Sequence, residues 1–575
     1  MNTDKHRFYT TNFAALRLCG ILLFCFALLI ISAIAQTQPK MSSRILLIPL
    51  DDRPPCLQFP VKMGLIGDAE IVTPPREILG RFTEAGKSDE IIKWLKTQNL
   101  KSFDAAIVSV DMLAYGGLVA MRVHQTDDQA ATRRIEFVRE MRRLAPKMKI
   151  YGSSVIMRLA PTGDVKNEAY REKLARWAEI SVETDEKSKS ETAKLEREIP
   201  AFALVDYKAA RVRDLKINLK TIDFVRENVI DYLILSQDDA KPHGIHVADR
   251  ERLISETAKL NLTEKIAIQP GADEVSMLLL ARSLTDKYNF HPKIKAIYSS
   301  EELADKAMPY EDRPLRQTVS FQIQSTGAIE VPKETDNFNI NILFCVYVSR
   351  FEKDRAKSFA EEVWKGKNVV VADIDPKGDV QGADVKFVES LINPSLSLKE
   401  NEKKNLPSFA NLLFMSGYAS WNTAGNTIGT ALPQGILTGL SNDSYFDVGV
   451  FRKNQKKNGK KDWKVKTEFL KRTAMAHEWF IMHRLIDDYA YHSIVRPKAL
   501  QLIKENKWNA FRLTDEQTKV VEDFCLKELQ PTITKIADDY KDFTKGKCEM
   551  SPITFNLPWN RTFEAEIDFK LQCPK

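Results

Sequence analysis

The feature that most constrains the fold is a repeated pattern in which a short apolar run ends abruptly in charged residues. The clearest example spans residues 232–236 and ends in Asp238 and Asp239, after which Pro242 and Gly244 prevent a strand from continuing. Buried carboxylates are costly unless they are solvated, paired or functional, so we expect this strand end to carry a site. The alternative is that Asp239 caps a helix beside a solvated neighbour.

Four further apolar runs end in the same way. The residues that follow them are Asp51, Asp52 and Arg53, then Asp111 and Tyr115, then Arg158, and finally Asp273 and Glu274. The carboxyl ends of parallel strands meet at one edge of a sheet, so the pattern predicts one polar pocket. A pocket rich in Asp suits a polyhydroxylated ligand or a metal, and does not suit an anion.

Strand-like and helix-like segments alternate from residue 44 to about residue 300, which indicates a parallel sheet covered by helices. The predicted strands lie at residues 44–50, 69–73, 104–110, 149–157, 231–236, 265–269 and 293–298. Seven such strands favour a (β/α)-barrel-like α/β domain over residues 42–330, with a single open sheet as the alternative. A charged helical insertion at residues 164–229 interrupts the alternation.

A second α/β segment is predicted for residues 331–465, with strands at 338–348, 368–374 and 411–416. Within it, Asn422 and Asn426 stand one helical turn apart beside Trp421, an arrangement that suits a sugar-binding ledge. The alternative is an Asn-capped helix start beside a core Trp. Residues 466–575 are predicted to be helical, with a closing C-terminal strand.

Composition and charge exclude several classes of partner. The 575 residues carry a net charge of +7, from 85 basic and 78 acidic residues spread along the chain. No basic stripe is interleaved with aromatic residues, so we expect no nucleic-acid partner. The sequence also lacks a Gly-rich phosphate loop and the motifs of serine and cysteine hydrolases, and we predict no cofactor and no bound metal.

The N-terminus is typical of an export signal. Lys5, Arg7 and Arg17 precede an apolar stretch at residues 18–35, which ends in a small-x-small cleavage pattern. We therefore predict a signal peptide over residues 1–35 and a periplasmic or extracellular protein. The alternative is an uncleaved anchor, because the apolar stretch is marginally long enough to span a bilayer.

Five cysteines lie beyond the predicted signal, and their odd number and wide spacing argue against a disulfide scaffold or a structural zinc site. Cys548 and Cys573 are the one pairing that we consider, as a clip on the C-terminal tail. Cys56 and Cys345 lie in apolar contexts, which predicts inert core thiols.

Six motifs in order identify a family resemblance. They lie at residues 49–54, 109–117, 235–239, 270–274, 421–427 and 558–564. Together they resemble a bacterial family catalogued only as domain of unknown function number 4127, over roughly residues 44–569. The family name implies no activity, so function must be argued from the site.

The Asp238–Asp239 pair is also similar, at the level of the fold, to the catalytic pair of barrel-type β-N-acetylhexosaminidases. That resemblance implies that Asp238 orients the acetamido group of the substrate, while Asp239 protonates the leaving oxygen. We expect these carboxylates to share one cleft with the other strand-end residues. At least one carboxyl there should carry a raised pKa, and Asp239 is our candidate.

The sequence therefore predicts an exported carbohydrate-active enzyme, a glycoside hydrolase with Asp238 and Asp239 as catalytic residues. The residues expected to bind substrate are Asp51, Asp52, Arg53, Asp111, Tyr115, Arg158, Asp273, Glu274, Trp421, Asn422 and Asn426. Two alternatives remain: a non-catalytic carbohydrate-binding protein of the cell envelope, and a metal-dependent hydrolase that uses Asp51, Asp52, Asp238 and His243.

Overall fold

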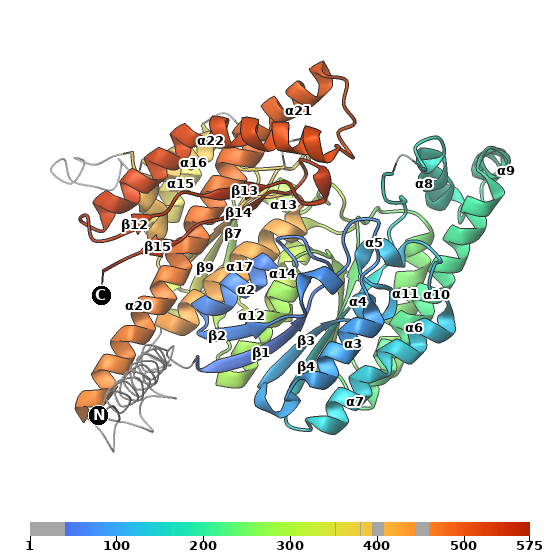
Figure 1. The fold of residues 1–575 in the computed structure, drawn as a ribbon, viewed down its shortest axis with the longest axis horizontal. Helices are drawn as coiled ribbons and strands as arrows, with labels where there is room; N and C mark the ends of the chain where they lie inside the picture. Colours follow the sequence, from blue (N-terminus) through green and yellow to red (C-terminus); the bar gives the residue numbers. More distant parts are fainter. Residues whose placement is uncertain are drawn as a thin grey trace, which may run out of the picture. The chain divides into compact units, whose positions relative to one another are not determined.

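A computed structural model describes most of the chain from residue 41 to residue 574 (Figure 1). The residues outside this description are 1–40, 165, 351, 353, 380, 394–406, 443–458 and 575. The predicted signal peptide at residues 1–35 lies outside the described residues. In the part that is described, no helix has the length and apolar character needed to cross a bilayer.

The first sheet contains six parallel strands in the order β2-β1-β3-β4-β5-β6. The strands are β1 (Ser43–Ile48), β2 (Ala69–Val72), β3 (Ala105–Ser109), β4 (Lys149–Ile156), β5 (Tyr232–Gln237) and β6 (Ile266–Pro270). Chain order reverses between β1 and β3, the kind of point where doubly wound sheets bind ligands at their carboxyl edge.

Both faces of this sheet are buried, which explains why its strands read as nearly continuous apolar runs. Ile45 and Leu47 of β1 pack into one hydrophobic cluster, whereas Leu46 and Ile48 pack into a second. Alternate residues therefore serve two cores. The helices around the sheet are α2 (Gln58–Ile66), α3 (Ser88–Thr97), α4 (Val110–Tyr115), α5 (Leu118–Met121), α6 (Asp128–Ile135), α7 (Phe137–Leu144), α11 (Ile245–Lys259) and α12 (Val275–Tyr288).

The second sheet contains five parallel strands in the order β11-β10-β9-β7-β8. The strands are β7 (Lys293–Tyr298), β8 (Ile329–Glu330), β9 (Ile342–Tyr347), β10 (Val369–Asp373) and β11 (Gly417–Ala419). Its helices are α13 (Glu301–Ala304), α14 (Leu315–Ser325), α15 (Arg355–Lys365), α16 (Val385–Leu391) and α17 (Ala424–Asn442). Counted along the chain, its strand order repeats the 2-1-3-4-5 order of the first sheet.

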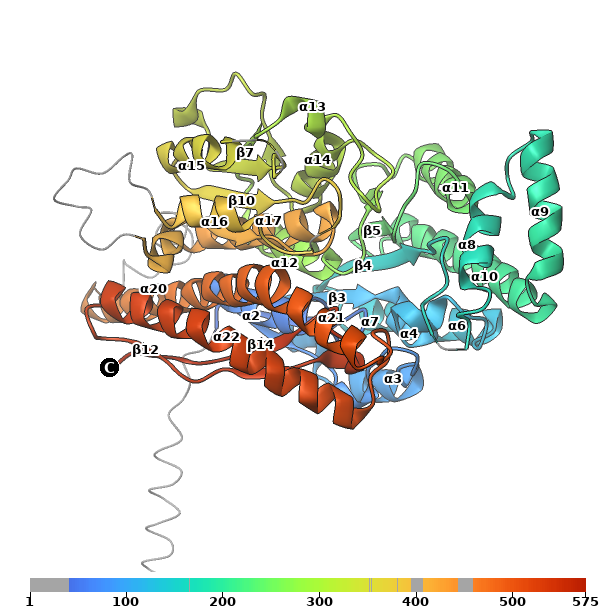
Figure 2. The same ribbon diagram turned by 90° about the horizontal axis from the view of Figure 1, so that it is seen from above.

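Parallel sheets with helical layers confirm the α/β class, but the described strands form two open sheets and not a closed barrel. The strand at Lys293–Tyr298, expected as the seventh barrel strand, pairs with β8 and β9 instead. The division between the sheets therefore falls before β7 and not at residue 330. Helix α12 connects them, and it contacts β3 and β4 on one side and α17 on the other (Figure 2).

The predicted helical insertion is present as α8 (Arg171–Ile180), α9 (Glu186–Glu198) and α10 (Ala201–Arg226). One predicted strand is wrong: residues 411–416 lie mainly in a 3-10 helix, Phe409–Phe414, at whose start the Ser408 hydroxyl accepts from the Ala410 backbone N–H. The strand β11 follows it.

The C-terminal region packs across both sheets. Its helices are α20 (Gly459–Arg484), a π-helix over Leu485–Val495, α21 (Arg496–Glu505) and α22 (Asp515–Phe543). Four short strands follow as two antiparallel pairs: β12 (Glu549–Met550) with β15 (Leu571–Gln572), and β13 (Thr554–Asn556) with β14 (Glu566–Asp568).

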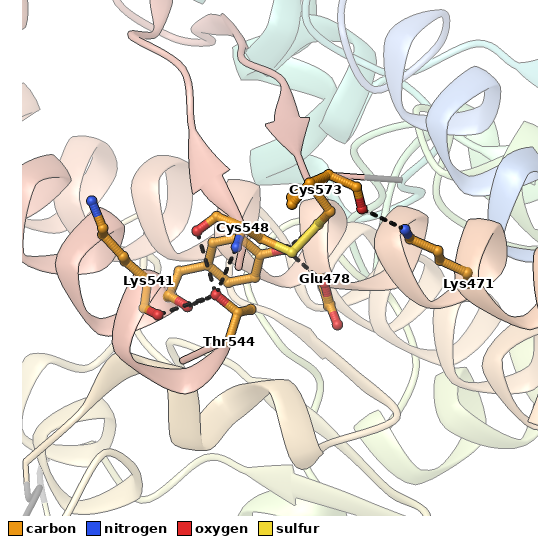
Figure 3. Close-up of a disulfide and its surroundings, with 8 residues drawn as sticks. Lys471, Glu478, Lys541, Thr544, Cys548 and Cys573 are labelled. Atoms are coloured by element: carbon orange, nitrogen blue, oxygen red, sulfur yellow. Dashed lines mark hydrogen bonds between the residues drawn. A yellow bond between two sulfur atoms is a disulfide. The ribbon is translucent and has the colours of Figure 1, made fainter. Parts of the chain in front are cut away.

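Cys548 and Cys573 form a disulfide, which confirms the predicted clip on the C-terminal tail (Figure 3). The Cys548 backbone N–H donates to Thr544 Oγ1 at 3.1 Å, and the Tyr540 hydroxyl beside it donates to Glu478 Oε2 at 2.9 Å. Lys471 of α20 also donates to the Pro574 carbonyl at 3.2 Å, so the tail is held beside the end of α22 by the disulfide and against α20 by this bond. The free cysteines Cys56, Cys345 and Cys525 are buried. For Cys56 and Cys345 this agrees with the prediction of core thiols.

Candidate active site

A cavity of about 490 Å³ lies at the carboxyl edge of the first sheet, within the size range of ligand sites. Strand ends of the first sheet contribute Arg53, Arg158, Asp238, Asp239 and Asp273. The second α/β segment contributes Tyr310, Glu311, Gln381, Asn422, Thr423 and Asn426. The C-terminal region contributes Arg496, Phe511, Trp559, Arg561 and Phe563. Residues separated by hundreds of positions therefore meet at one site.

Asp238 and Asp239 both line this cavity, although adjacent residues of a strand point to opposite faces. Asp239 resolves the conflict because its φ of 35° lies in the left-handed region, where Asp is more common than most residues. Asp238 Oδ2 accepts from Arg122 Nη2 at 2.5 Å, and Asp239 Oδ2 accepts from Arg158 Nη1. Asp238 is buried, whereas the Asp239 side chain is 37% exposed and is the more accessible to a ligand.

Two carboxyls that line the cavity, Asp273 and Glu311, have raised pKa values, and sequence reasoning missed Glu311. Glu311 is 4% exposed, and its burial raises the pKa to about 7. Its two oxygens accept from the Gly425 backbone N–H at 2.7 Å and from the Thr318 hydroxyl at 2.6 Å. A carboxyl that titrates near neutrality suits proton transfer. Asp239, by contrast, lies in an ion pair with Arg158.

Arg53 is enclosed by three carboxylates and uses all five of its N–H groups. Its Nη2 donates to Asp51 Oδ2 at 2.7 Å and to Asp273 Oδ1 at 2.6 Å, and its Nη1 donates to Glu564 Oε1 at 2.8 Å. The remaining Nε donates to Asp51 Oδ2 at 3.0 Å. Burial raises the pKa of Asp273 to about 6 against the opposing effect of Arg53. Asp51 accepts hydrogen bonds from Arg53 and does not itself line the cavity.

Asp52 fixes the C-terminal segment and also lies outside the cavity lining. Its Oδ1 accepts from Trp559 Nε1 at 2.7 Å, and its Oδ2 accepts from Arg76 Nε at 3.3 Å. The Trp559 ring packs against the Arg53 guanidinium, 4.7 Å from the ring centroid. The sequence motifs at residues 49–54 and 558–564 therefore contact each other directly.

Asp111 and Tyr115 are buried beneath the site and do not line the cavity. Asp111 Oδ2 accepts from the Val155 backbone N–H at 3.0 Å, and burial raises its pKa well above the usual range. The Tyr115 ring lies 4.2 Å from the guanidinium carbon of Arg213. These contacts join α4 to β4 and to α10, which is a structural role.

Glu274 and Trp421 are likewise buried away from the cavity lining. Glu274 accepts from the Ala272 backbone N–H at 3.1 Å, and burial raises its pKa to about 8. Trp421 is 4% exposed, and its Nε1 donates to the Thr430 hydroxyl, as in the core-Trp alternative. Asn422 and Asn426 do line the cavity, whereas Trp421 does not.

The cavity also contains Arg122, Arg171, Arg496 and Arg561, which sequence reasoning missed. The first two lie at or near helix ends outside the strand-end pattern, so the pattern could not find them. Arg561 lies inside the sequence motif at residues 558–564, so it is the one of these four arginines that the sequence could have identified. Burial, together with the nearby Arg158, lowers the pKa of Arg122 to about 10.

The residues proposed for a metal do not come together. Asp51 and Asp52 are committed to arginines and Trp559, and His243 is exposed. Burial lowers the pKa of the neighbouring His246 to about 4, and its Nε2 accepts from the Lys241 backbone N–H. Among the described residues, no group of three or more His, Cys, Asp or Glu side chains is placed to hold a metal ion.

Comparisons with known proteins agree with the motif pattern. A family model described as "Protein of unknown function (DUF4127)" matches residues 45–568. Searches of the curated proteins and of the solved structures gave no match. Function therefore has to be inferred from the cavity.

Proposed function

Because the chain belongs to the DUF4127 family, which has no assigned activity, we propose its function from the cavity: a carbohydrate-active enzyme that cleaves glycosidic bonds. The observation that carries the proposal is the pairing of Glu311, with a pKa of about 7, and Asp239, held by Arg158, in one cavity. Glycosidic cleavage needs one protonated carboxyl and one ionised carboxylate at the same site.

Glu311 is the proposed general acid. Its near-neutral pKa allows it to hold a proton at physiological pH and to give it to the leaving oxygen. Asp239 is the proposed base or nucleophile, because it is the more exposed carboxylate of the Asp238–Asp239 pair and Arg158 fixes its position. The two carboxyls come from different parts of the fold, Asp239 from the end of β5 and Glu311 from the loop between α13 and α14. Arg171 lies within electrostatic range of both Asp239 and the neighbouring Tyr310.

The rest of the lining suits a sugar. Tyr310 and Phe511 are 54% and 69% exposed, and they offer aromatic faces to the C–H surface of a sugar ring. The amides of Gln381, Asn422 and Asn426 offer both donors and acceptors to hydroxyl groups. This combination of aromatic and amide groups supports a saccharide ligand.

We also propose that the protein is exported to the periplasm or the extracellular space. The Cys548–Cys573 disulfide supports export, because disulfides persist in oxidising compartments. Signal cleavage at residue 35 would be read directly by N-terminal sequencing of the mature protein.

The test of function is turnover of a panel of aryl glycosides by the purified protein, with N-acetylhexosaminides included. The N-acetylhexosaminide arm tests the substrate-assisted form, in which Asp238 orients an acetamide. Release of the aryl group from one class of glycoside supports the proposal. Binding of saccharides without turnover would instead establish the non-catalytic binding protein, and chelator-sensitive turnover would favour the metal-dependent hydrolase.

A further inference from the structure

Six arginines line the cavity, and four of them are paired with carboxylates. The four pairs are Arg53 with Asp51, Asp273 and Glu564, Arg122 with Asp238, Arg158 with Asp239, and Arg561 with Glu564. Every carboxylate in these pairs is therefore already engaged by a guanidinium.

Arg171 and Arg496 differ from the other four arginines because each donates to a backbone carbonyl and not to a carboxylate. Arg171 Nε donates to the Pro161 carbonyl at 3.0 Å, and Arg496 Nε donates to the Thr562 carbonyl at 2.8 Å. Within the described part of the chain, the terminal guanidinium nitrogens of these two residues have no protein acceptor. Both residues line the cavity, one from the start of α8 and the other from the start of α21.

Burial acts against both charges and is the main cause that lowers the pKa of each arginine. Arg158 adds to this effect at Arg171 and Arg561 adds to it at Arg496, while Asp239 near Arg171 and Glu564 near Arg496 act in the opposite direction without accepting from the terminal nitrogens. A partly buried guanidinium without an anion loses hydration and gains repulsion. A bound anion would supply acceptors for the terminal nitrogens, and paired N–H···O contacts to carboxylate or sulfate oxygens are strong.

We infer that the saccharide bound in this cavity is anionic, carrying a carboxylate or a sulfate group that Arg171 and Arg496 bind. The inference rests on the proposed function, since it takes the cavity to be a saccharide site. It also reverses the expectation, drawn from the Asp-rich strand ends, that the pocket does not suit an anion. The reversal has two causes: the aspartates are already paired with Arg53, Arg122 and Arg158, and the strand-end pattern did not include Arg171 and Arg496.

The test is isothermal titration of the full chain with three probes: glucuronic acid, glucose 6-sulfate and glucose. We expect at least one acidic sugar to bind about 10-fold or more tightly than glucose, and the two acidic arms distinguish carboxylate from sulfate. Arg171→Gln and Arg496→Gln should each weaken binding of the acidic sugar by about 10–100-fold more than they weaken binding of glucose. Arg143→Gln, at a side chain that is 69% exposed and outside the cavity, is the matched control.

Two results would overturn the inference while leaving the proposed function standing: glucose binding as tightly as both acidic sugars, or a preference for acidic sugars that survives in both arginine variants. Failure of every saccharide, neutral or acidic, to bind or to be hydrolysed would remove the proposed function as well. Using two variants from different segments guards against misfolding of either one.

Discussion

Trp559 donates its indole N–H to the buried carboxylate of Asp52 at 2.7 Å, across 507 positions of sequence. The same ring covers Arg53, whose guanidinium binds Asp51, Asp273 and Glu564. The C-terminal segment is thus part of the wall of the cavity, and the site is complete only when the end of the chain has docked.

Replacing Trp559 with Phe tests this docking. The variant keeps an aromatic ring but leaves the Asp52 carboxylate without its indole donor, so we expect a loss of about 1–3 kcal/mol in the free energy of unfolding. Urea denaturation measures it. Trp364→Phe is the matched control, because the Trp364 Nε1 is buried and has no hydrogen-bond partner among the described residues. Equal effects of the two substitutions would contradict the role given to the Asp52 bond.

Arg53→Lys tests the contribution of the carboxylate cage, the three carboxylates of Asp51, Asp273 and Glu564 that surround Arg53. A lysine cannot present five N–H groups to three carboxylates, so buried charge is left unpaired, and breaking such a pair costs about 3–5 kcal/mol. Thermal unfolding should show a large decrease for Arg53→Lys and almost none for Arg143→Lys, which alters an exposed pair. A variant as stable as the parent would mean that the cage contributes little.

The disulfide gives a prediction about the tail. Cys548 and Cys573 close a loop with a sequence separation of 25, for which chain entropy predicts about 3 kcal/mol of stabilisation. Cys548→Ser together with Cys573→Ser should therefore lower stability and speed proteolysis after residue 543. Cys345→Ser, at a buried free thiol, is the control for loss of a sulfur atom alone. An unchanged cleavage rate in the double variant would show that strand pairing alone holds the tail.

Glu311 gives the pH dependence. A general acid must be protonated, and burial raises the pKa of Glu311 to about 7, so kcat/KM should decline about tenfold per pH unit above that value. Glu311→Gln should remove this decline. Its loss of rate should also be smaller for aryl glycosides with good leaving groups, which need little protonation. A decline that persists in Glu311→Gln would assign the proton to another group.

Much of the fold could be predicted from the sequence because both faces of the first sheet, and of β9 and β10 in the second, are buried, so these strands read as apolar runs with polar ends. The strand at residues 293–298 was predicted with the bounds that the structure shows, but it was assigned to the first sheet and lies in the second. Nothing in an apolar run specifies which neighbour it pairs with, and α12 carries the chain to a second sheet.

The site was predictable only where it follows the strand-end pattern. Asp238, Asp239 and Asp273 line the cavity for that reason, as does Arg158. Glu311 lies in a loop with no local signature, and its pKa depends on burial by partners distant in sequence. Asp52 and Asp111 follow the pattern but are used in structural contacts, because a strand end shows where a side chain lies and not what binds it.

The most direct test of the central claim measures turnover and ligand binding separately for Asp239→Asn and Glu311→Gln. Exposed positions provide the controls, Asp523→Asn and Glu302→Gln. We predict that the parent and both controls hydrolyse an aryl glycoside, whereas each cavity variant loses about 10²–10⁴-fold in kcat and still binds the saccharide. Full turnover in both cavity variants, or no turnover and no saccharide binding by the parent protein, would contradict the account.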